Sequence, residues 1–542
     1  MLFWIWFVAL TAAALIYFQH KHSRFRKYGV KNRMPLPLFG NNFRVILRLD
    51  HFVEEMVKFY NSCPNERFIG HFDFVKPVIV IRDLDLVKKI TVKDFNHFVD
   101  HRADVDKDVD PIIAGNLAIM KGEEWRDMRG TLSPAFTSSK IRLMVPFMVE
   151  VGDQMVKALT KKIKDSDDNY FDGDVKDLMT RYTNDVIASC AFGLKVDSHA
   201  DENNQFYLMG KQVFNFGFKQ LLVIVGFSCF PSLIKRLKLT LFSGSSKKFF
   251  SDLVLGTIRD REEQHIIRPD MIHLLMQAKK GQLIHDDQTS KDADAGFATV
   301  EESAVGEKKI NRAWTDNDLI AQAVLFFAAG FETISSAMCF LLHELAVNPD
   351  VQEKLLREIR EHDQNNDGKF DFNSIQKMTY LDMVVSEALR LWPPAIFLDR
   401  KCTEDYNIGK ANEKCTEDYI LRKGEGVSIP MWAIHRDPEF FPDPLKFDPE
   451  RFSERNRHKI KPYAYMPFGL GPRNCIGSRF ALCEIKVMTY QLLRSMDLSP
   501  AAKTQIPFKL SKKHLNLRME GGHWLRFKIR NQNVENNTET IY

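Results

Sequence analysis

The chain begins with an uninterrupted apolar segment that carries no charge. Residues 1–18 read MLFWIWFVALTAAALIYF, about the length that a helix needs to cross a hydrocarbon core, with aromatic residues near both ends. Six basic residues follow between Lys21 and Arg33, whereas the first acidic residue is Asp50. This pattern predicts an uncleaved membrane anchor over residues 1–20, with the basic side in the cytosol. A cleaved secretory signal is the alternative, but its charged first segment is missing.

Helical periodicity dominates the apolar positions after residue 50, and few strand-like alternations occur. A length of 542 residues allows two domains or one large one, and the continuous helical pattern favours a single α-rich body over residues 41–530. A basic, proline-rich hinge over 21–40 precedes it, and 531–542 reads as a flexible tail. Residues 281–311 are polar and non-periodic, which predicts a long, exposed and mobile loop.

Three helices can be placed from their ends. The first begins at the cap Thr315 and runs to Asn348, the second covers residues 350–362, and the third covers 379–391 before two prolines. The middle of the first helix is almost entirely apolar, so a second membrane span is one interpretation. However, it contains Glu332 and its polar neighbours, which are costly at a membrane midplane. A buried central helix fits better.

Charge and cysteine content exclude several classes of function. The net charge is +5 and no basic stripe is present, which argues against nucleic-acid binding. The eight cysteines have no zinc-site spacing and are too few for a disulfide scaffold. The repeated sequence KCTEDY, at residues 401–406 and 414–419, predicts a pair of surface turns. Reduced thiols facing the cytosol are expected, and the cysteine between glycines, Cys475, is a candidate for ligand chemistry.

Cys475 lies in PFGLGPRNCIG, where a glycine-rich loop enters a helical pattern. The glycines would let the backbone approach a flat ligand, and the positive helix end would lower the pKa of the thiol and hold it as a thiolate. A thiolate is a suitable axial ligand for a haem iron, and Arg473 can meet a propionate carboxylate. A plain glycine-rich turn and a phosphate loop are alternatives, although the latter lacks its Gly-Lys-Ser/Thr ending.

The segment from Phe468 to Gly477 resembles the complete haem-binding signature of the cytochrome P-450 family. Other motifs of the family occur in order: Trp125 and Arg129 in KGEEWRDMRG, AGFET over 329–333, the E-x-x-R pair, and PERF over 449–452. The resemblance extends from the anchor to residue 524 and implies a mainly α fold: one large helical domain with a minor β-region. The phrase YTNDVIASCAFG over 182–193 and the long polar insertion resemble those of insect microsomal members that metabolise xenobiotics.

The resemblance also assigns roles to residues. The proposed cofactor-binding residues are Trp125, Arg129, Ala329, Gly330, Arg400, Phe468, Arg473, Cys475 and Gly477, with Cys475 as axial iron ligand. Glu332 and Thr333 would orient water and pass protons toward iron-bound oxygen, while Gly330 allows a local opening of the helix. Glu387, Arg390 and Arg451 would form a structural triad that braces the cysteine loop.

The implied reaction inserts one atom of O2 into a lipophilic substrate, using haem b and electrons from NADPH. Because the chain has no flavin or nicotinamide motif, the electrons would come from an NADPH-cytochrome P-450 reductase, with cytochrome b5 as a second donor. Arg479 and Lys486 are predicted docking contacts for the acidic reductase. The expected location is the endoplasmic reticulum membrane, with the catalytic domain on the cytosolic face.

Four segments are expected to line a hydrophobic substrate pocket. They are residues 98–117, 206–230, 326–329 and 395–398. The substrates implied by the resemblance are insecticides and plant toxins, with hormone or lipid hydroxylation as the alternative. A haem-thiolate isomerase would tend to lack the Glu332–Thr333 pair, and a haem carrier or gas sensor would not need it.

Overall fold

The structure is a computed structural model. It describes residues 2–214, 223, 226, 231–237, 239–240, 244–283, 297–300, 314–366, 371–514 and 516–530. The helices are α1 (Leu2–His22), α2 (Phe43–Ile46), α3 (Phe52–Asn61), α4 (Leu84–Lys88), α5 (Pro111–Ala114), α6 (Gly122–Leu132), α7 (Ser138–Arg142), α8 (Val145–Lys164), α9 (Val175–Phe192), α10 (Gln205–Phe214), α12 (Pro231–Leu237), α13 (Gly244–Gln264), α14 (Met271–Lys279), α15 (Asp316–Val347), α16 (Pro349–Asn365), α17 (Phe372–Gln376), α18 (Thr379–Leu391), α19 (Met431–Ile434) and α20 (Ser478–Ser495).

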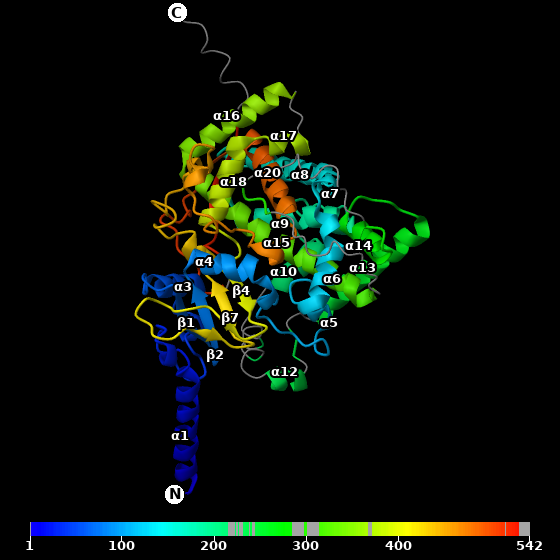
Figure 1. Cartoon of the computed structure of the whole chain (residues 1–542). Coiled ribbons are helices and arrows are strands. Elements are labelled where there is room, and N and C mark those ends of the chain that lie inside the picture. The colour runs from blue at the N-terminus through cyan, green and yellow to red at the C-terminus, as the bar shows by residue number, and fades with distance from the viewer. Residues whose placement is uncertain are drawn as a thin grey trace, which may run out of the picture.

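The strands are few and form three small sheets. They are β1 (Phe68–Asp73), β2 (Lys76–Ile81), β3 (Phe171–Asp174), β4 (Leu398–Lys401), β5 (Tyr406–Asn407), β6 (Ile420–Leu421), β7 (Gly426–Ile429), β8 (Met496–Pro500) and β9 (Trp524–Ile529). The largest sheet has the order β1-β2-β7-β4, with only β2 and β7 parallel, and the others are β3-β9-β8 and β5-β6. The four-stranded sheet lies next to the C-terminal end of α1, and helices make up most of the remaining body (Figure 1). The predicted mainly α fold with a minor β-region is confirmed.

The central helix α15 forms as the sequence predicts. The Thr315 hydroxyl accepts the backbone N–H of Asp318, whose carboxylate accepts the N–H of Thr315, so the end is closed by a capping box. α15 and α1 are both long and apolar enough to cross a membrane. The apolar window of α15 is 67% buried inside the protein, whereas that of α1 is 0% buried. The prediction of a buried central helix is therefore confirmed, and α1 is the helix that could act as a membrane anchor.

Two segments predicted to be exposed are only partly exposed where the structure describes them. In the predicted loop 281–311, Ala298 is buried, and the backbone N–H of Phe297 donates to Asp382 at 2.9 Å. These residues belong to the short apolar run AGFATV, whose side chains can be buried although the rest of the segment is polar. The KCTEDY repeats do contain surface bends, as predicted, at 403–404 and 416–417, but Cys402 and Cys415 are both buried in one apolar cluster near β5 and β6. Residues 284–296, 301–313 and 531–542 lie outside the described residues.

Candidate active site

An interior cavity of about 360 Å³ lies between α15 and the loop that contains Cys475. Its lining is mostly apolar and includes Phe136, Met144, Ile187, Cys190, Phe326, Ala329, Gly330, Thr333, Ile334, Leu398, Arg400, Phe468, Gly469, Arg473, Cys475 and Gly477. The segments predicted to line a pocket contribute unequally. Phe326, Ala329, Ala395 and Leu398 line the cavity, but Phe206 packs in the core against α13 and α15, and 215–222 lies outside the described residues.

The cysteine loop folds back on itself before α20. The backbone N–H of Cys475 donates to the Phe468 carbonyl at 2.8 Å, and the side chain is exposed toward the cavity. Gly471 has a positive φ of 67°, and a Cβ there would lie 1.8 Å from the carbonyl oxygen of Thr91. This glycine therefore permits a close approach of the chain to its own backbone, rather than to a ligand as expected from the sequence.

The Cys475 thiol does not have the low pKa that the helix end was expected to produce. Although the thiol faces the cavity, the surrounding protein desolvates it and so raises its pKa, and the Gly477 N–H and the charge of Arg129 only partly oppose that shift. α20 begins three residues later, at Ser478, so the desolvation of the sulfur outweighs the positive end of the helix. Coordination to a metal would favour the thiolate directly, because metal binding and thiol deprotonation are linked.

Three guanidinium groups, those of Arg129, Arg400 and Arg473, lie at or close to the cavity. Few carboxylates are near enough to balance their charge. Arg400 is 1% exposed, and its Nε has no hydrogen-bond partner among the described residues. Burial lowers the pKa of Arg400 to about 10, and burial together with the charge of Arg400 lowers that of Arg473 to about 9. Three N–H groups of Arg473 donate to backbone carbonyls of Val99, Leu117 and Met120. This excess of buried positive charge fits a ligand with carboxylates, such as the propionates of a haem.

The tryptophan and arginine of α6 reach this region in different ways. Arg129 donates to the Asn474 carbonyl at 2.9 Å and to its side-chain oxygen at 2.7 Å, and so supports the residue next to Cys475. Trp125 is buried, and the guanidinium of Arg473 lies 4.1 Å from the centre of its ring. Neither side chain lines the cavity. His101, which belongs to the segment 98–117 predicted to line the pocket, lines the cavity and contacts Asp399 at 3.0 Å.

The AGFET segment of α15 presents two faces. Ala329 and Thr333 are exposed toward the cavity, and the Thr333 hydroxyl donates to the Ala329 carbonyl. Gly330 does not open the helix, which is uninterrupted from Asp316 to Val347. A Cβ on Gly330 would instead lie 2.8 Å from Ile187 Cδ1, so this glycine allows α9 to pack closely.

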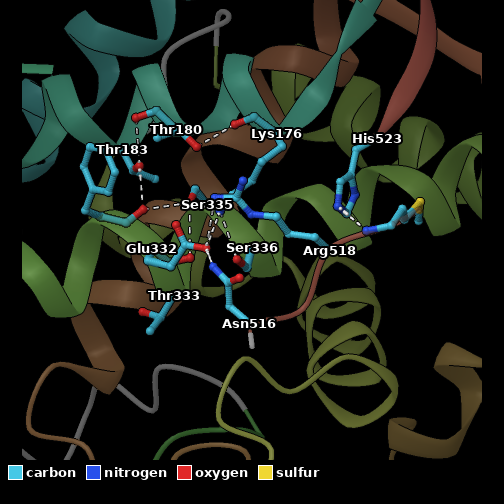
Figure 2. A network of polar contacts seen from close by, with 12 residues as sticks. Lys176, Thr180, Thr183, Glu332, Thr333, Ser335, Ser336, Asn516, Arg518 and His523 are labelled. Atoms are coloured by element: carbon cyan, nitrogen blue, oxygen red, sulfur yellow. Dashed lines mark hydrogen bonds and ion pairs between the residues drawn. The ribbon is translucent and has the colours of Figure 1, made fainter. Parts of the chain in front are cut away.

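Glu332 lies on the other side of α15 and does not line the cavity. Its carboxylate forms an ion pair with Lys176 of α9 at 3.2 Å and accepts a hydrogen bond from Asn516. Figure 2 shows these contacts in one polar network, with Thr333 apart from it. Lys176 could not be singled out from the sequence, because 155 residues separate it from Glu332 and no local pattern indicates their proximity.

Glu387, Arg390 and Arg451 come together as a buried ionic cluster. Arg390 donates twice to Glu387, at 2.6 and 2.9 Å, and Arg451 donates to the same carboxylate at 3.3 Å. Arg390 also donates to the carbonyl of His435 at 2.7 Å. The ring of His435 accepts the backbone N–H of Met466, two residues before Phe468, at 3.0 Å. His435 thus links the cluster to the cysteine loop, a connection that the sequence did not indicate.

One of the two predicted docking contacts is wrong. The Lys486 side chain is 0% exposed and pairs with Asp382 of α18 at 2.9 Å, so it cannot meet a partner at the surface. The predicted docking position falls on the face of α20 that packs against α18 and α17. Arg479, near the start of the same helix, is only partly buried.

Comparisons with known proteins agree with this geometry. A sequence model of the family described as Cytochrome P450 matches residues 31–525. Cytochrome P450 9e2 of Blattella germanica is 43% identical, covering 97% of this chain and 98% of its own length. Probable cytochrome P450 9f2 of Drosophila melanogaster is 40% identical (97% and 100% covered), and probable cytochrome P450 6a13 of the same species is 36% identical (96% and 98%). The chain therefore belongs to the cytochrome P450 family and is a monooxygenase that uses haem and molecular oxygen.

Proposed function

We propose that the chain inserts one atom of O2 into lipophilic foreign compounds, such as insecticides and plant toxins, with electrons that NADPH supplies through a separate reductase. The observation that carries this proposal is the cavity itself, which has Cys475 on one side, Thr333 on the other and mostly apolar side chains between them. Apolar walls select substrates by the area they bury, so lipophilic molecules of many shapes are suitable.

Each part of the site would have a distinct task. The Cys475 sulfur would hold the haem iron, and the haem would supply the chemistry that activates O2. Arg400 and Arg473 would bind its propionates. Arg129 would support the neighbouring loop through its hydrogen bonds to Asn474. Ala329 leaves room on the cavity face of α15. Thr333 places a hydroxyl there that can accept and pass on a proton, while the apolar lining keeps other water out.

The ligand assignment is tested by reducing the purified protein, adding carbon monoxide and recording the difference spectrum. A strongly red-shifted Soret band is expected for the wild type, and Cys475→Ser should abolish it. Cys63→Ser is the matched control, because Cys63 is only partly buried and lies outside the cavity. A band at the position of histidine-ligated haem, or one that survives in Cys475→Ser, would remove the basis of the proposal.

The reaction is tested by supplying NADPH, a reductase and a panel of lipophilic insecticides and plant toxins. Product formation should depend on both NADPH and the reductase, and Thr333→Val should divert electrons from product to hydrogen peroxide. Turnover of peroxides without NADPH would indicate an isomerase instead. Bound haem with no turnover, and no effect of Thr333→Val, would indicate a carrier or sensor. A panel of steroid and fatty-acid substrates, run in parallel, separates detoxification from hormone or lipid hydroxylation.

We also propose that α1 anchors the body to the cytosolic face of the endoplasmic reticulum membrane. Its 21 residues span about 32 Å as a helix, which is close to the roughly 30 Å of a hydrocarbon core. Deletion of residues 1–20 should release the protein from microsomes. Protease added to intact microsomes should digest the body, whereas protection of the body would place it in the lumen.

A further inference from the structure

The polar segment between α14 and α15 sends a short apolar run against the body of the protein. Of this run, the structure describes residues 297–300, which read FATV. The backbone N–H of Phe297 donates to Oδ2 of Asp382 in α18 at 2.9 Å, and Ala298 is buried. Oδ1 of the same carboxylate lies 2.9 Å from Nζ of the buried Lys486 in α20. One carboxylate therefore ties the run to two helices, and α20 is the helix that follows the cysteine loop.

Phe297 completes a cluster of three aromatic rings. The centre of its ring lies 4.9 Å from that of Phe452 and 5.5 Å from that of Tyr465. The rings of Phe452 and Tyr465 are themselves 4.9 Å apart. The three interplanar angles of 66°, 46° and 57° are tilted or edge-on arrangements, which aromatic pairs prefer. Each ring thus contacts the other two, and the loss of Phe297 would remove two of the three contacts.

Tyr465 connects this cluster to the loop that contains Cys475. Its ring also stacks on that of His435, with the ring centres 5.5 Å apart and the planes 21° from parallel. His435 accepts the backbone N–H of Met466, the residue after Tyr465, at 3.0 Å. Two residues farther on, the Phe468 carbonyl accepts the N–H of Cys475. A displacement of the Tyr465 ring would consequently be passed to the backbone that holds the cysteine.

We propose that Phe297 is a positioning residue for the haem ligand: its ring holds Tyr465 in place and so fixes the loop that contains Cys475. The inference rests on the haem ligation assigned to Cys475 in the proposed function. Neither Phe297 nor Tyr465 lines the cavity. The segment between α14 and α15 would therefore serve the site from outside, by bracing the iron-binding loop without touching haem or substrate.

A purely structural contribution of Phe297 would lower the stability of the whole domain without affecting the loop in particular. Phe249 of α13 offers the comparison, because it is also partly buried and also contacts two rings. Those rings belong to Phe206 and Phe250, at 6.4 and 5.3 Å. Phe249 packs against a different apolar cluster from Phe297 and does not line the cavity. Phe249→Ala is therefore the matched control.

The first test is hydrogen–deuterium exchange of the protein as purified, followed in peptides that cover residues 463–470. Phe297→Ala should speed exchange there about tenfold, because both ring contacts of Phe297 are lost. Phe297→Leu keeps apolar volume against Tyr465 and should restore most of the protection. Phe249→Ala should leave exchange over 463–470 as in the wild type. Unchanged exchange of this segment in Phe297→Ala would overturn the proposal.

The second test times the loss of thiolate ligation. The reduced carbon monoxide complex of each protein is held the same number of degrees below its own Tm, and the decay of the red-shifted Soret band is recorded. The band should decay about tenfold faster in Phe297→Ala than in the wild type or Phe249→Ala. Equal decay in the two alanine variants would make Phe297 a packing residue only, against the proposal. A wild type without the red-shifted band would overturn the haem ligation instead, and the exchange over 463–470 would still decide whether Phe297 holds the loop.

Discussion

Replacement of Gly471 by alanine should damage the cysteine loop more than the same change at its neighbouring glycines. Gly471 has a φ of +67°, and an added Cβ would lie 1.8 Å from the carbonyl oxygen of Thr91. The obstacle is backbone, so no side-chain rotation can relieve it. Gly469 has a φ of +78°, but its Cβ would be 3.5 Å from Leu398. Gly477 has a φ of −95° and would place its Cβ 3.7 Å from Phe136.

These differences translate into an order of costs. A left-handed backbone costs an alanine about 1–2 kcal/mol, and a forced shift of packed groups adds about 1–3 kcal/mol. Gly471→Ala should therefore lose about 2–5 kcal/mol, Gly469→Ala about 1–2 kcal/mol and Gly477→Ala close to nothing. For 542 residues, an unfolding entropy of about 1 kcal/mol per kelvin converts the largest loss to a Tm shift of about 2–5 °C.

The assay measures Tm together with the ratio of Soret to protein absorbance, since the loop contains Cys475, the proposed haem ligand. Gly471→Ala should lose haem and stability, Gly469→Ala should be intermediate, and Gly477→Ala should match the wild type. Equal behaviour of Gly471→Ala and Gly477→Ala would refute the idea that contact with the Thr91 carbonyl fixes the loop. Loss of haem in Gly477→Ala alone would show that the glycines serve the ligand rather than the backbone.

Three more predictions follow from buried charges. Arg400→Leu should weaken haem retention yet leave the haem-free protein as stable as the wild type or more so, because the guanidinium is buried with an unpartnered Nε; a lower Tm of the haem-free variant would contradict this. Glu387→Gln should cost about 3–5 kcal/mol in unfolding free energy, because Arg390 would lose its buried partner, and a loss below about 1 kcal/mol in denaturant titrations would count against it. Burial raises the pKa of Glu344 to about 7 from 4.5. The folded protein therefore binds the proton more tightly, and stability should fall by roughly 3 kcal/mol as pH rises from 4.5 to 7. Glu344→Gln should abolish that part of the decline in Tm, and parallel pH curves for the two proteins would rule it out.

The features that the sequence predicts well are those with local causes. The cap at Thr315, the apolar middle of α15 and the prolines after α18 each act within a few residues, and the structure has both helices at the predicted bounds. Cys475 could likewise be singled out, because the motif around it is contiguous.

The features that were missed depend on contacts across the chain. The pairing of Lys486 with Asp382 reverses the meaning of an apparently exposed charge. Gly330 serves Ile187 of another helix, and Lys176 reaches Glu332 only when α9 packs on α15. In each of these cases the decisive partner is distant in sequence, and single-sequence periodicity carries no information about it.

We expect the surplus of buried guanidinium groups to make the amount of this enzyme dependent on cofactor supply. A ligand that binds only the folded state stabilises it by RT ln(1 + [L]/Kd), and here the anionic ligand would also relieve the mutual repulsion of Arg400 and Arg473. Chains made when haem is scarce would open more often and be degraded sooner. The steady-state level of the protein would then follow the haem concentration of the cell, without any separate sensor.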